Sequence, residues 1–508
     1  MLARAHTFTI EGLHTRHVTV EVDIRRGLPA FAIVGLADTA VREARERVQT
    51  AVLNSGYEFP ARRITANLAP GDVPKAGPGL DLALACAVLA ASGQLPADRL
   101  ESHALFGELG LDGAVRPSWG ALAVAQATRR AGLRGLLLAA GGAPEASLIE
   151  GLDILAVERL ASAVRVLRGG HGDRAPRPAT PPETTAGVAG PDLSEVRGQP
   201  HAVRALVIAA AGAHNILLSG PPGTGKTMLA QRIPSILPAL SRREAIEVAR
   251  IGSLTGERVE GLTRTRPFRA PHHSITTAGL IGGARRASIG EVVRAHNGVL
   301  FLDELSEFAR PTLEALRQPL EDGRVAISRA RHSAVYPARF MLVAATNPCP
   351  CGYAGEGERC GCSEAELARH RRRLSGPLLD RIDLLVSLHL TGAGEPSGAP
   401  SMSSAEARAQ VAEARQRQAA RLRREAVSVN AHMDVRLLQR HARLGARGSE
   451  LMCRARDSGL LSARGEHRVL RVARTIADLN GSERVRARDV GAALALRTDA
   501  TPVGSRAA

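Results

Sequence analysis

Residues 215–227 read Asn-Ile-Leu-Leu-Ser-Gly-Pro-Pro-Gly-Thr-Gly-Lys-Thr, and this stretch decides the fold. Its apolar start predicts a β-strand that runs into a glycine-rich turn, and the residues that follow are compatible with a helix. Backbone N–H groups of such a turn point inward and cradle phosphate oxygens at the start of the helix. This strand–turn–helix context disfavours a chance match to the pattern. The predicted phosphate loop consists of Gly220, Pro221, Pro222, Gly223, Thr224, Gly225, Lys226 and Thr227.

Lys226 stands out because the chain has 67 basic side chains and only two of them are lysines, the other being Lys75. A compact ammonium on a flexible stem can sit between two phosphate oxygens, whereas a planar guanidinium cannot take that place without strain. We expect Lys226 to reach the β- and γ-phosphates of a nucleotide and the Thr227 hydroxyl to ligate Mg²⁺. The sequence therefore predicts a site for a nucleoside triphosphate.

Two further apolar strands are predicted to end in polar side chains. Residues 298–304, Gly-Val-Leu-Phe-Leu-Asp-Glu, place Asp303 to hold Mg²⁺ through water and Glu304 to orient and deprotonate an attacking water. A surface acidic pair is the alternative, and the order of the two motifs disfavours it. A strand over 340–345 is followed by Asn347, whose amide can hydrogen-bond the γ-phosphate and the lytic water.

Charge that develops on a transferred phosphoryl group needs a positive partner. Arg381 is a candidate to act on the site of a neighbouring subunit, which implies a ring; a local ion pair with Asp380 or Asp383 is the alternative. Arg464 and Arg471 are two helical turns apart and can present one face of a helix to the phosphates.

The composition points to a polyanionic partner. A formal charge of +17 attracts nucleic acid over long range, although an arginine-rich proteome would also produce it. Aromatic residues make up only 2% of the chain, so phosphate contacts should outweigh base stacking. The sequence contains neither a run of about 18 apolar residues nor a leader pattern at its start. We expect a cytoplasmic protein with no membrane partner.

The pattern of strands, helices and linkers predicts three domains in the 508 residues. An α/β domain over 1–168 carries helices at 39–53 and 80–91. A linker rich in proline and glycine follows at 169–191, then an α/β ATPase core at 192–390 and a second linker at 391–404. The last domain, 405–500, is helical, with helices predicted at 405–424 and 464–479.

Four of the six cysteines form two close pairs, Cys349 with Cys351 and Cys360 with Cys362. Two pairs separated by an eight-residue, glycine-rich loop can fold into one tetrahedral thiolate site for Zn²⁺. Redox-active or free thiols are the alternative, while disulfides are disfavoured in a reducing cytosol.

Residues 325–336 predict a β-hairpin with a basic tip. Arg329, Arg331 and His332 at that tip could grip a phosphate backbone without reading bases, and a solvated turn is the alternative. Residues 267–273, Pro-Phe-Arg-Ala-Pro-His-His, form a second loop that is either structural or faces DNA.

The order of GPPGTGKT, RPFRAPHHS, AHNGVLFLDEL, LRQPLEDG, NPCPCG and SGPLLDRIDL resembles the ComM/YifB family of magnesium-chelatase-like AAA+ ATPases, over nearly the whole chain. The resemblance implies an α/β fold with a P-loop AAA+ core, a Lon-protease-like (ribosomal S5 domain 2-like) N-terminal domain and a C-terminal helical lid. It implies an ATP-driven hexameric ring, Asn347 as sensor 1 and Arg381 as arginine finger. The resemblance does not choose between Arg464 and Arg471 as sensor 2 in the lid.

In the N-terminal domain, residues 74–79 resemble the loop that holds the nucleophile of Lon proteases. Gly79 stands at the serine position, and the region expected to hold the partner lysine reads Val-Arg-Pro-Ser at 115–118. Peptide hydrolysis therefore has no nucleophile, and we expect a scaffold or binding module. Lys75 is a candidate to contact a phosphate or a carboxylate.

Together these features predict an ATP-hydrolysing ring motor that acts on branched or single-stranded DNA. The resemblance implies branch migration or helicase activity in homologous recombination or natural transformation. One alternative is a chelatase-type motor that drives metal insertion through partner subunits, although the chain shows neither an acidic metal-capture tract nor a tetrapyrrole pocket. The other alternative is a protein remodeller.

Overall fold

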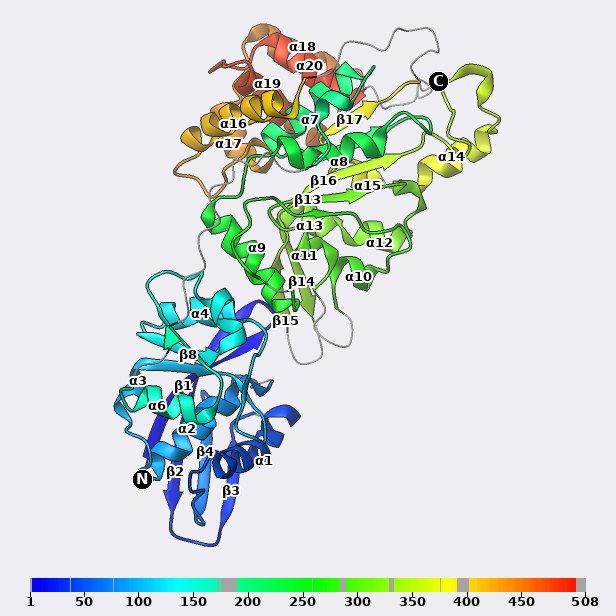
Figure 1. Cartoon of the computed structure of the whole chain (residues 1–508). Helices are drawn as coiled ribbons and strands as arrows, with labels where there is room; N and C mark the ends of the chain where they lie inside the picture. Colours follow the sequence, from blue (N-terminus) through cyan, green and yellow to red (C-terminus); the bar gives the residue numbers. More distant parts are fainter. Residues whose placement is uncertain are drawn as a thin grey trace. The chain divides into compact units, whose positions relative to one another are not determined.

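Two structural units contain the strands and helices of the chain (Figure 1). The computed structural model describes residues 2–36, 38–75, 77–170, 173–174, 190–257, 259–283, 289–328, 333–374, 376–390 and 402–498. Unit 1 spans 1–184 together with 242–263 and 328–336, and unit 2 spans 185–241, 264–327 and 337–508.

Unit 1 is built on an eight-stranded mixed sheet with the order β10-β9-β8-β5-β1-β2-β4-β3. Alternating apolar residues put one face of β2 into the core, with Val18, Val20 and Val22 all buried. The pairs β1–β2, β2–β4 and β9–β10 are antiparallel, and the remaining pairs are parallel. The strands are β1 (Leu2–Glu11), β2 (His14–Arg25), β3 (Ala30–Val34), β4 (Arg63–Ala69), β5 (His103–Phe106), β8 (Gly135–Ala139), β9 (Asp153–Val157) and β10 (Asp173–Arg174), with a separate hairpin of β6 (Glu108–Leu109) and β7 (Val115–Arg116).

Helices cover this sheet and complete its core. Every residue of α2 is buried, because the helix is apolar on all sides after Asp81, whose carboxylate pairs with Arg47. The helix α9, which belongs to the predicted ATPase core by sequence, packs on α4 in unit 1, where Ala249 and Ile246 join the same apolar cluster. The helices are α1 (Thr39–Asn54), α2 (Asp81–Ala91), α3 (Asp98–Ser102), α4 (Ala121–Arg130), α5 (Ala143–Ala146), α6 (Leu160–Leu167) and α9 (Arg242–Leu254).

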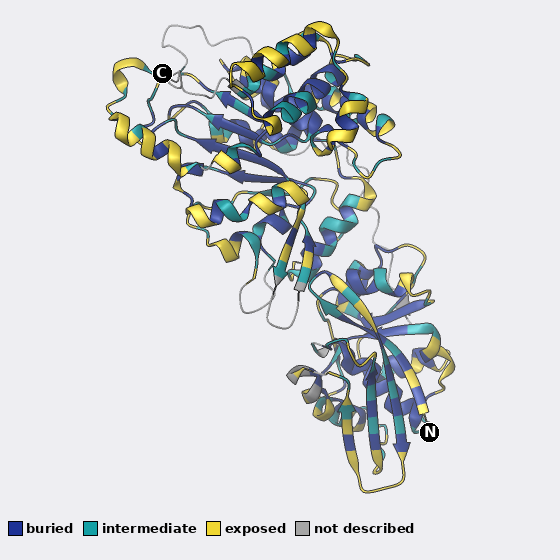
Figure 2. Ribbon diagram, turned by 180° about the vertical axis from the view of Figure 1, so that it is seen from behind, coloured by how far each residue is buried: buried dark blue, intermediate teal, exposed yellow. Residues whose placement is uncertain are grey.

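Unit 2 contains a five-stranded parallel sheet with the order β12-β13-β16-β11-β17. The strands β11, β13 and β16 are short apolar runs buried on both faces, as a parallel sheet covered by helices requires (Figure 2). Because all strands run the same way, the residues that follow them meet at one edge of the sheet. The strands are β11 (Ile216–Ser219), β12 (Phe268–Arg269), β13 (Val299–Leu302), β16 (Met341–Thr346) and β17 (Leu384–Ser387).

The C-terminal helices share one apolar core with this sheet. The helix α16 packs on α7 and α8, α19 packs on α7, and α20 contacts β17. The helices of unit 2 are α7 (Pro200–Gly212), α8 (Lys226–Ile236), α10 (Thr277–Ile281), α11 (Glu291–Arg294), α12 (Arg310–Ala315), α13 (Arg317–Asp322), α14 (Glu364–Arg373), α15 (Gly376–Leu379), α16 (Ser404–Arg421), α17 (Val435–His441), α18 (Ala446–Asp457), α19 (Ala463–Leu479) and α20 (Ala487–Thr498). A separate two-stranded sheet pairs β14 (Arg324–Ser328) with β15 (Ser333–Pro337), most of which belongs to unit 1, and these strands match the predicted hairpin.

Most of the predicted elements are confirmed to within a few residues. The helices expected at 39–53, 80–91, 405–424 and 464–479 are α1, α2, α16 and α19, of which α16 ends three residues early at Arg421. The first predicted linker contains the short strand β10, which extends the sheet of unit 1. Residues 391–401 of the second predicted linker lie outside the described residues. Within the described part of the chain, none of the helices combines the length and the apolar character needed to span a membrane.

Candidate active site

The phosphate loop joins β11 to α8 at the edge where the parallel strands end. Gly225 adopts φ +85°, a left-handed conformation that favours glycine, and it caps the N-terminus of α8. Gly220 also requires glycine, because a Cβ there would lie 2.5 Å from the backbone oxygen of Leu388. The loop therefore leaves the first N–H groups of α8 free for an anion, and the helix dipole favours one there.

Lys226 is the first residue of α8, and its ammonium is held inside the loop. Its Nζ donates to the backbone oxygens of Gly220 (2.7 Å) and Pro221 (2.8 Å) and to Oδ1 of Asn347 (3.1 Å). Burial lowers the pKa of Lys226, and the nearby charge of Asp303 opposes that shift. The contact with Asn347 brings the predicted phosphate lysine and the predicted water-orienting amide together.

Thr227 and Asp303 form the second part of the site. The Thr227 hydroxyl donates to Oδ2 of Asp303 over 2.7 Å, and the backbone N–H of Glu304 donates to Oδ1 of the same carboxylate over 2.9 Å. A hydroxyl and a carboxylate are hard oxygen ligands of the kind Mg²⁺ prefers. The donor set and the anion-binding loop thus fit a magnesium–nucleotide complex.

Glu304 is exposed next to this pair and has a partner that sequence reasoning missed. Its backbone is left-handed, with φ +51°, and its carboxylate lies 3.2 Å from Nδ1 of His273. His273 follows β12 in the loop 267–273, which we expected to be structural or to face DNA. The two adjacent histidines of that loop were the only signal, and nothing in their spacing pointed to Glu304.

Arg381 lies at the opposite edge of the sheet, just before β17 begins. It is only 5% exposed, and its guanidinium donates to the carboxylate of Glu321 and to the backbone oxygen of Pro377. Arg381 therefore forms a local ion pair, as the alternative interpretation held, but its partner is Glu321 rather than Asp380 or Asp383. Its role on a neighbouring subunit stays a prediction.

Arg464 and Arg471 also lie away from the phosphate loop of their own chain. Both line a cavity of about 450 Å³. Asn215, Phe340 and Asp383, which immediately precede β11, β16 and β17, line the same cavity. Arg471 donates from Nε to the backbone oxygen of Met433 over 2.8 Å. A four-residue strand separates the two edges by about 13 Å, so these arginines do not join the site of Lys226.

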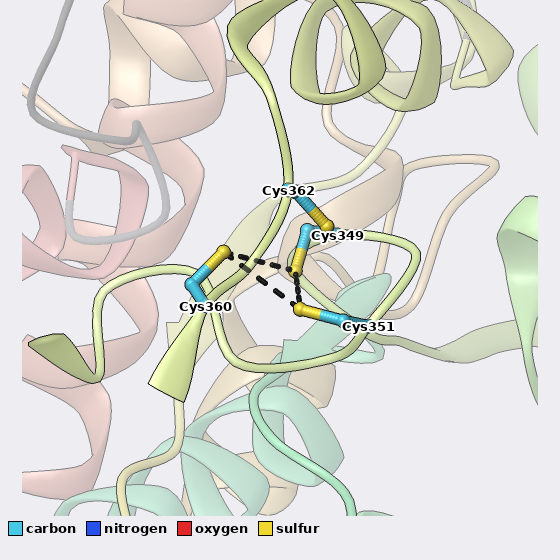
Figure 3. Close-up of side chains that lie close together, drawn as sticks. All are labelled: Cys349, Cys351, Cys360 and Cys362. Atoms are coloured by element: carbon cyan, nitrogen blue, oxygen red, sulfur yellow. Dashed lines mark hydrogen bonds between the residues drawn. The ribbon is translucent and has the colours of Figure 1, made fainter. Parts of the chain in front are cut away.

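The four cysteines converge as predicted from their spacing (Figure 3). Their sulfur atoms all lie within 4.8 Å of one another, and the Sγ atoms of Cys349 and Cys351 are 3.3 Å apart. None of the four forms a disulfide. A backbone hydrogen bond from Tyr353 and a second one from the thiol of Cys349 lower the pKa of Cys351 to about 6. The donor set, four sulfur atoms close enough to share one ion, fits a divalent metal of the zinc type.

Two other sets of predicted residues have different outcomes. Arg329, Arg331 and His332 at the hairpin tip lie outside the described residues. Lys75 is fully buried, and its ammonium donates to the backbone oxygen of Pro70, so the expected ligand contact is not available to it. Burial lowers the pKa of Lys75 and the charge of Asp72 opposes this shift.

Three family models match successive parts of the chain. The family described as magnesium chelatase, subunit ChlI, matches residues 192–395. Subunit ChlI of Mg-chelatase matches 20–141, and the C-terminal part of magnesium chelatase subunit ChlI matches 401–497.

Whole-length relatives are found in several bacteria. YifB of Escherichia coli (strain K12) is 44% identical, over 95% of this chain and 94% of that protein. The competence protein ComM of Haemophilus influenzae is 41% identical, over 95% of each chain. An uncharacterised protein of Mycobacterium tuberculosis (strain H37Rv) is 45% identical, over 98% of each chain.

Proposed function

We propose that this chain, which belongs to the ComM/YifB family of magnesium-chelatase-like proteins, is an ATPase that works as a ring-shaped motor on DNA. Family membership makes it an AAA+-type ATPase connected in general with competence and recombination. The observation that carries the ATPase assignment is one edge of the sheet of unit 2, where Lys226 contacts Asn347 and Thr227 contacts Asp303.

Each side chain at that edge has a separate chemical task. Lys226 binds the phosphates as a point charge, and its half-buried position strengthens that interaction. Thr227 and Asp303 hold Mg²⁺, which neutralises charge on the phosphate oxygens when it is bound. Glu304 accepts the proton of the attacking water, and Asn347 orients that water against the phosphate.

The arginines at the opposite edge support a ring in which adjacent subunits share a site. Arg381, Arg464 and Arg471 lie at the edge of the sheet away from their own phosphate loop, and we propose that this edge faces the nucleotide of the neighbour in a ring. Arg381 would then have to exchange its contact with Glu321 for the phosphates of that nucleotide. Mixing Lys226→Ala protein with Arg381→Ala protein should then restore part of the activity that each lacks. A confirmed mixed ring without any recovery would contradict shared sites.

DNA is the proposed substrate because the chain carries a large positive charge and because a relative is named for competence. The helix α14 adds an exposed basic surface, defined here as Arg369, Arg371 and Arg372. Exposed guanidinium groups bind a phosphate backbone without reading bases. We propose strand exchange at branched junctions as the reaction that ATP hydrolysis drives.

Steady-state phosphate release with different added polymers tests this function. Branched DNA should stimulate turnover most, and ATP should drive strand exchange on the same substrate. No stimulation by any DNA, together with no strand exchange, would refute the DNA motor. Stimulation by unfolded protein would instead favour a remodeller, and stimulation only by a tetrapyrrole-binding partner would favour a chelatase-type motor.

We also propose that Cys349, Cys351, Cys360 and Cys362 bind one Zn²⁺. Four sulfur atoms within 4.8 Å of one another are close to the arrangement that a tetrahedral thiolate site needs. Elemental analysis of protein purified without chelator should give stoichiometric zinc. Absence of metal, with the thiols either free or oxidised, would refute the assignment.

For unit 1 we propose a binding role on a Lon-protease-like fold. Gly79 is buried, and a Cβ at that position would lie 2.4 Å from the ring of Phe106. A nucleophilic side chain therefore does not fit there, which supports a module without protease activity.

A further inference from the structure

The cysteine cluster lies next to the nucleotide site, and the contact between the two has a consequence for ATP binding. We infer that the loop 349–362, clamped by the metal, is a positioning element that braces Pro222 of the phosphate loop and Asn347 against each other. This inference rests on the proposed zinc centre. It adds a link from the occupancy of that centre to nucleotide affinity.

The first contact joins the cysteine loop to the phosphate loop. Gly352 is buried, and a Cβ there would lie 2.6 Å from Cδ and 2.9 Å from Cγ of Pro222. The backbone of Gly352 therefore packs directly on the proline ring with no room for a side chain. Its N–H donates to the backbone oxygen of Cys349 over 3.0 Å, so the residue that touches Pro222 is held by the cluster itself.

The second contact joins the loop to the predicted water-orienting residue. Asn347 is two residues before Cys349, and its side-chain oxygen accepts from Lys226. Its backbone oxygen is 3.0 Å from Nε2 of His370 on α14. That helix begins directly after Cys362, where Ser363 and Glu366 form a capping box. Both ends of the cysteine loop are thus anchored at Asn347.

Constraint by the metal is what makes this loop an effective brace. Between the second and third cysteines the chain includes Gly352, Gly355 and Gly357, all with positive φ, and such a segment has high backbone freedom when it is not tied down. Four thiolate bonds close the segment into one geometry. Without them Pro222 loses the surface behind it, and the phosphate loop can move by a fraction of an ångström or more. Misplacement of a positioned group by about 1 Å can lower the reaction rate by up to about 100-fold.

Two glycines of this loop make a matched pair for a test. Gly352 and Gly355 have nearly the same positive φ, +89° and +93°, a range that disfavours alanine at either position. They differ in surroundings, because nothing lies within 4 Å of a Cβ at Gly355. We expect Gly352→Ala to weaken binding of a fluorescent ATP analogue about tenfold, and Gly355→Ala to leave it within about twofold of the parent. Zinc content should be the same in both variants.

Removal of a ligand completes the test. Cys351 is exposed, so Cys351→Ser should lose metal while the protein still folds, as checked by circular dichroism; Cys453→Ser, at the exposed cysteine on α18, is the control. We expect Cys351→Ser to weaken nucleotide binding about tenfold and Cys453→Ser to have no effect. Unchanged affinity in either Gly352→Ala or metal-free Cys351→Ser would overturn the inference.

The readouts separate this inference from the proposals on which it rests. If the parent protein contains no metal, the zinc centre is wrong and the inference falls with it. If metal is present and affinity does not depend on it, only the inference falls. Nucleotide affinity and zinc content are measured without DNA, so neither result depends on the DNA motor.

Discussion

Replacing Lys226 by arginine keeps the charge and tests whether the shape of the ammonium matters. In the structure, one nitrogen is surrounded by three acceptors at 2.7 Å, 2.8 Å and 3.1 Å, supplied by Gly220, Pro221 and Asn347. A guanidinium is longer and carries its donors in a rigid planar fork, so it cannot occupy that position with the same contacts.

The magnitude follows from the loss of one charged donor that acts on the phosphates. Removal of a single such group from a site that stabilises developing charge costs about 2.7–4 kcal/mol, or about 10²–10³ in kcat. The backbone N–H groups of the loop and the start of α8 remain in place. We therefore expect Lys226→Arg to lower kcat by at least about 10²-fold and to weaken nucleotide binding much less.

The assay is phosphate release at saturating ATP, paired with equilibrium binding of a nucleotide and a thermal melt. Lys75→Arg is the matched control, because Lys75 is the other lysine of the chain and is fully buried in unit 1. Overpacking should destabilise that variant by about 1–3 kcal/mol and leave turnover unchanged below its melting temperature. A Lys226→Arg protein whose turnover stays within about threefold of the parent would refute the reasoning.

Three further predictions concern unit 2. Glu304→Gln should lower turnover by about 10²–10⁴ with nucleotide affinity retained, because it removes only the proton acceptor; an equal loss of affinity would contradict this. Glu321→Gln should destabilise the protein by about 1 kcal/mol in a thermal melt, since Arg381 is buried and Glu321 half exposed, and an unchanged melt would argue against the ion pair. Asp383→Asn should destabilise unit 2 by about 3 kcal/mol at pH 7, because Arg468, 2.6 Å away, loses its partner. Although burial alone would raise it, hydrogen bonding to His214 and the charge of Arg468 hold the pKa of Asp383 well below its usual range. The stabilisation is therefore complete above the ordinary pKa of about 3.9 and is lost as the pH falls below it, so denaturation curves of parent and variant should converge in acid.

Much of the nucleotide site could be predicted from the sequence because parallel strands bring their ends together. Lys226, Asp303 and Asn347 each follow a short apolar run, and the carboxyl ends of such strands meet at one edge of a sheet. The grouping of the cysteines could also be predicted. The two members of each pair are separated by a single residue, so a loop between the pairs is enough to bring all four sulfur atoms together. In both cases the relevant geometry is local or is imposed by a regular element.

Only the tertiary structure decided which edge of the sheet each arginine faces and which groups it pairs with. The helical period places Arg464 and Arg471 on one face of α19 but does not say where that helix packs on the sheet. Arg381 pairs with Glu321, 60 residues away. His273, which follows β12, contacts Glu304, which follows β13. The sequence shows Gly352 only as a loop residue, and its contact with Pro222 becomes visible only in the folded structure. These contacts join segments that are far apart in the sequence, and no periodic pattern of residues predicts them. They depend on how the whole unit packs to bury its apolar surface. Polar groups buried by that packing then pair with the polar groups that lie closest to them.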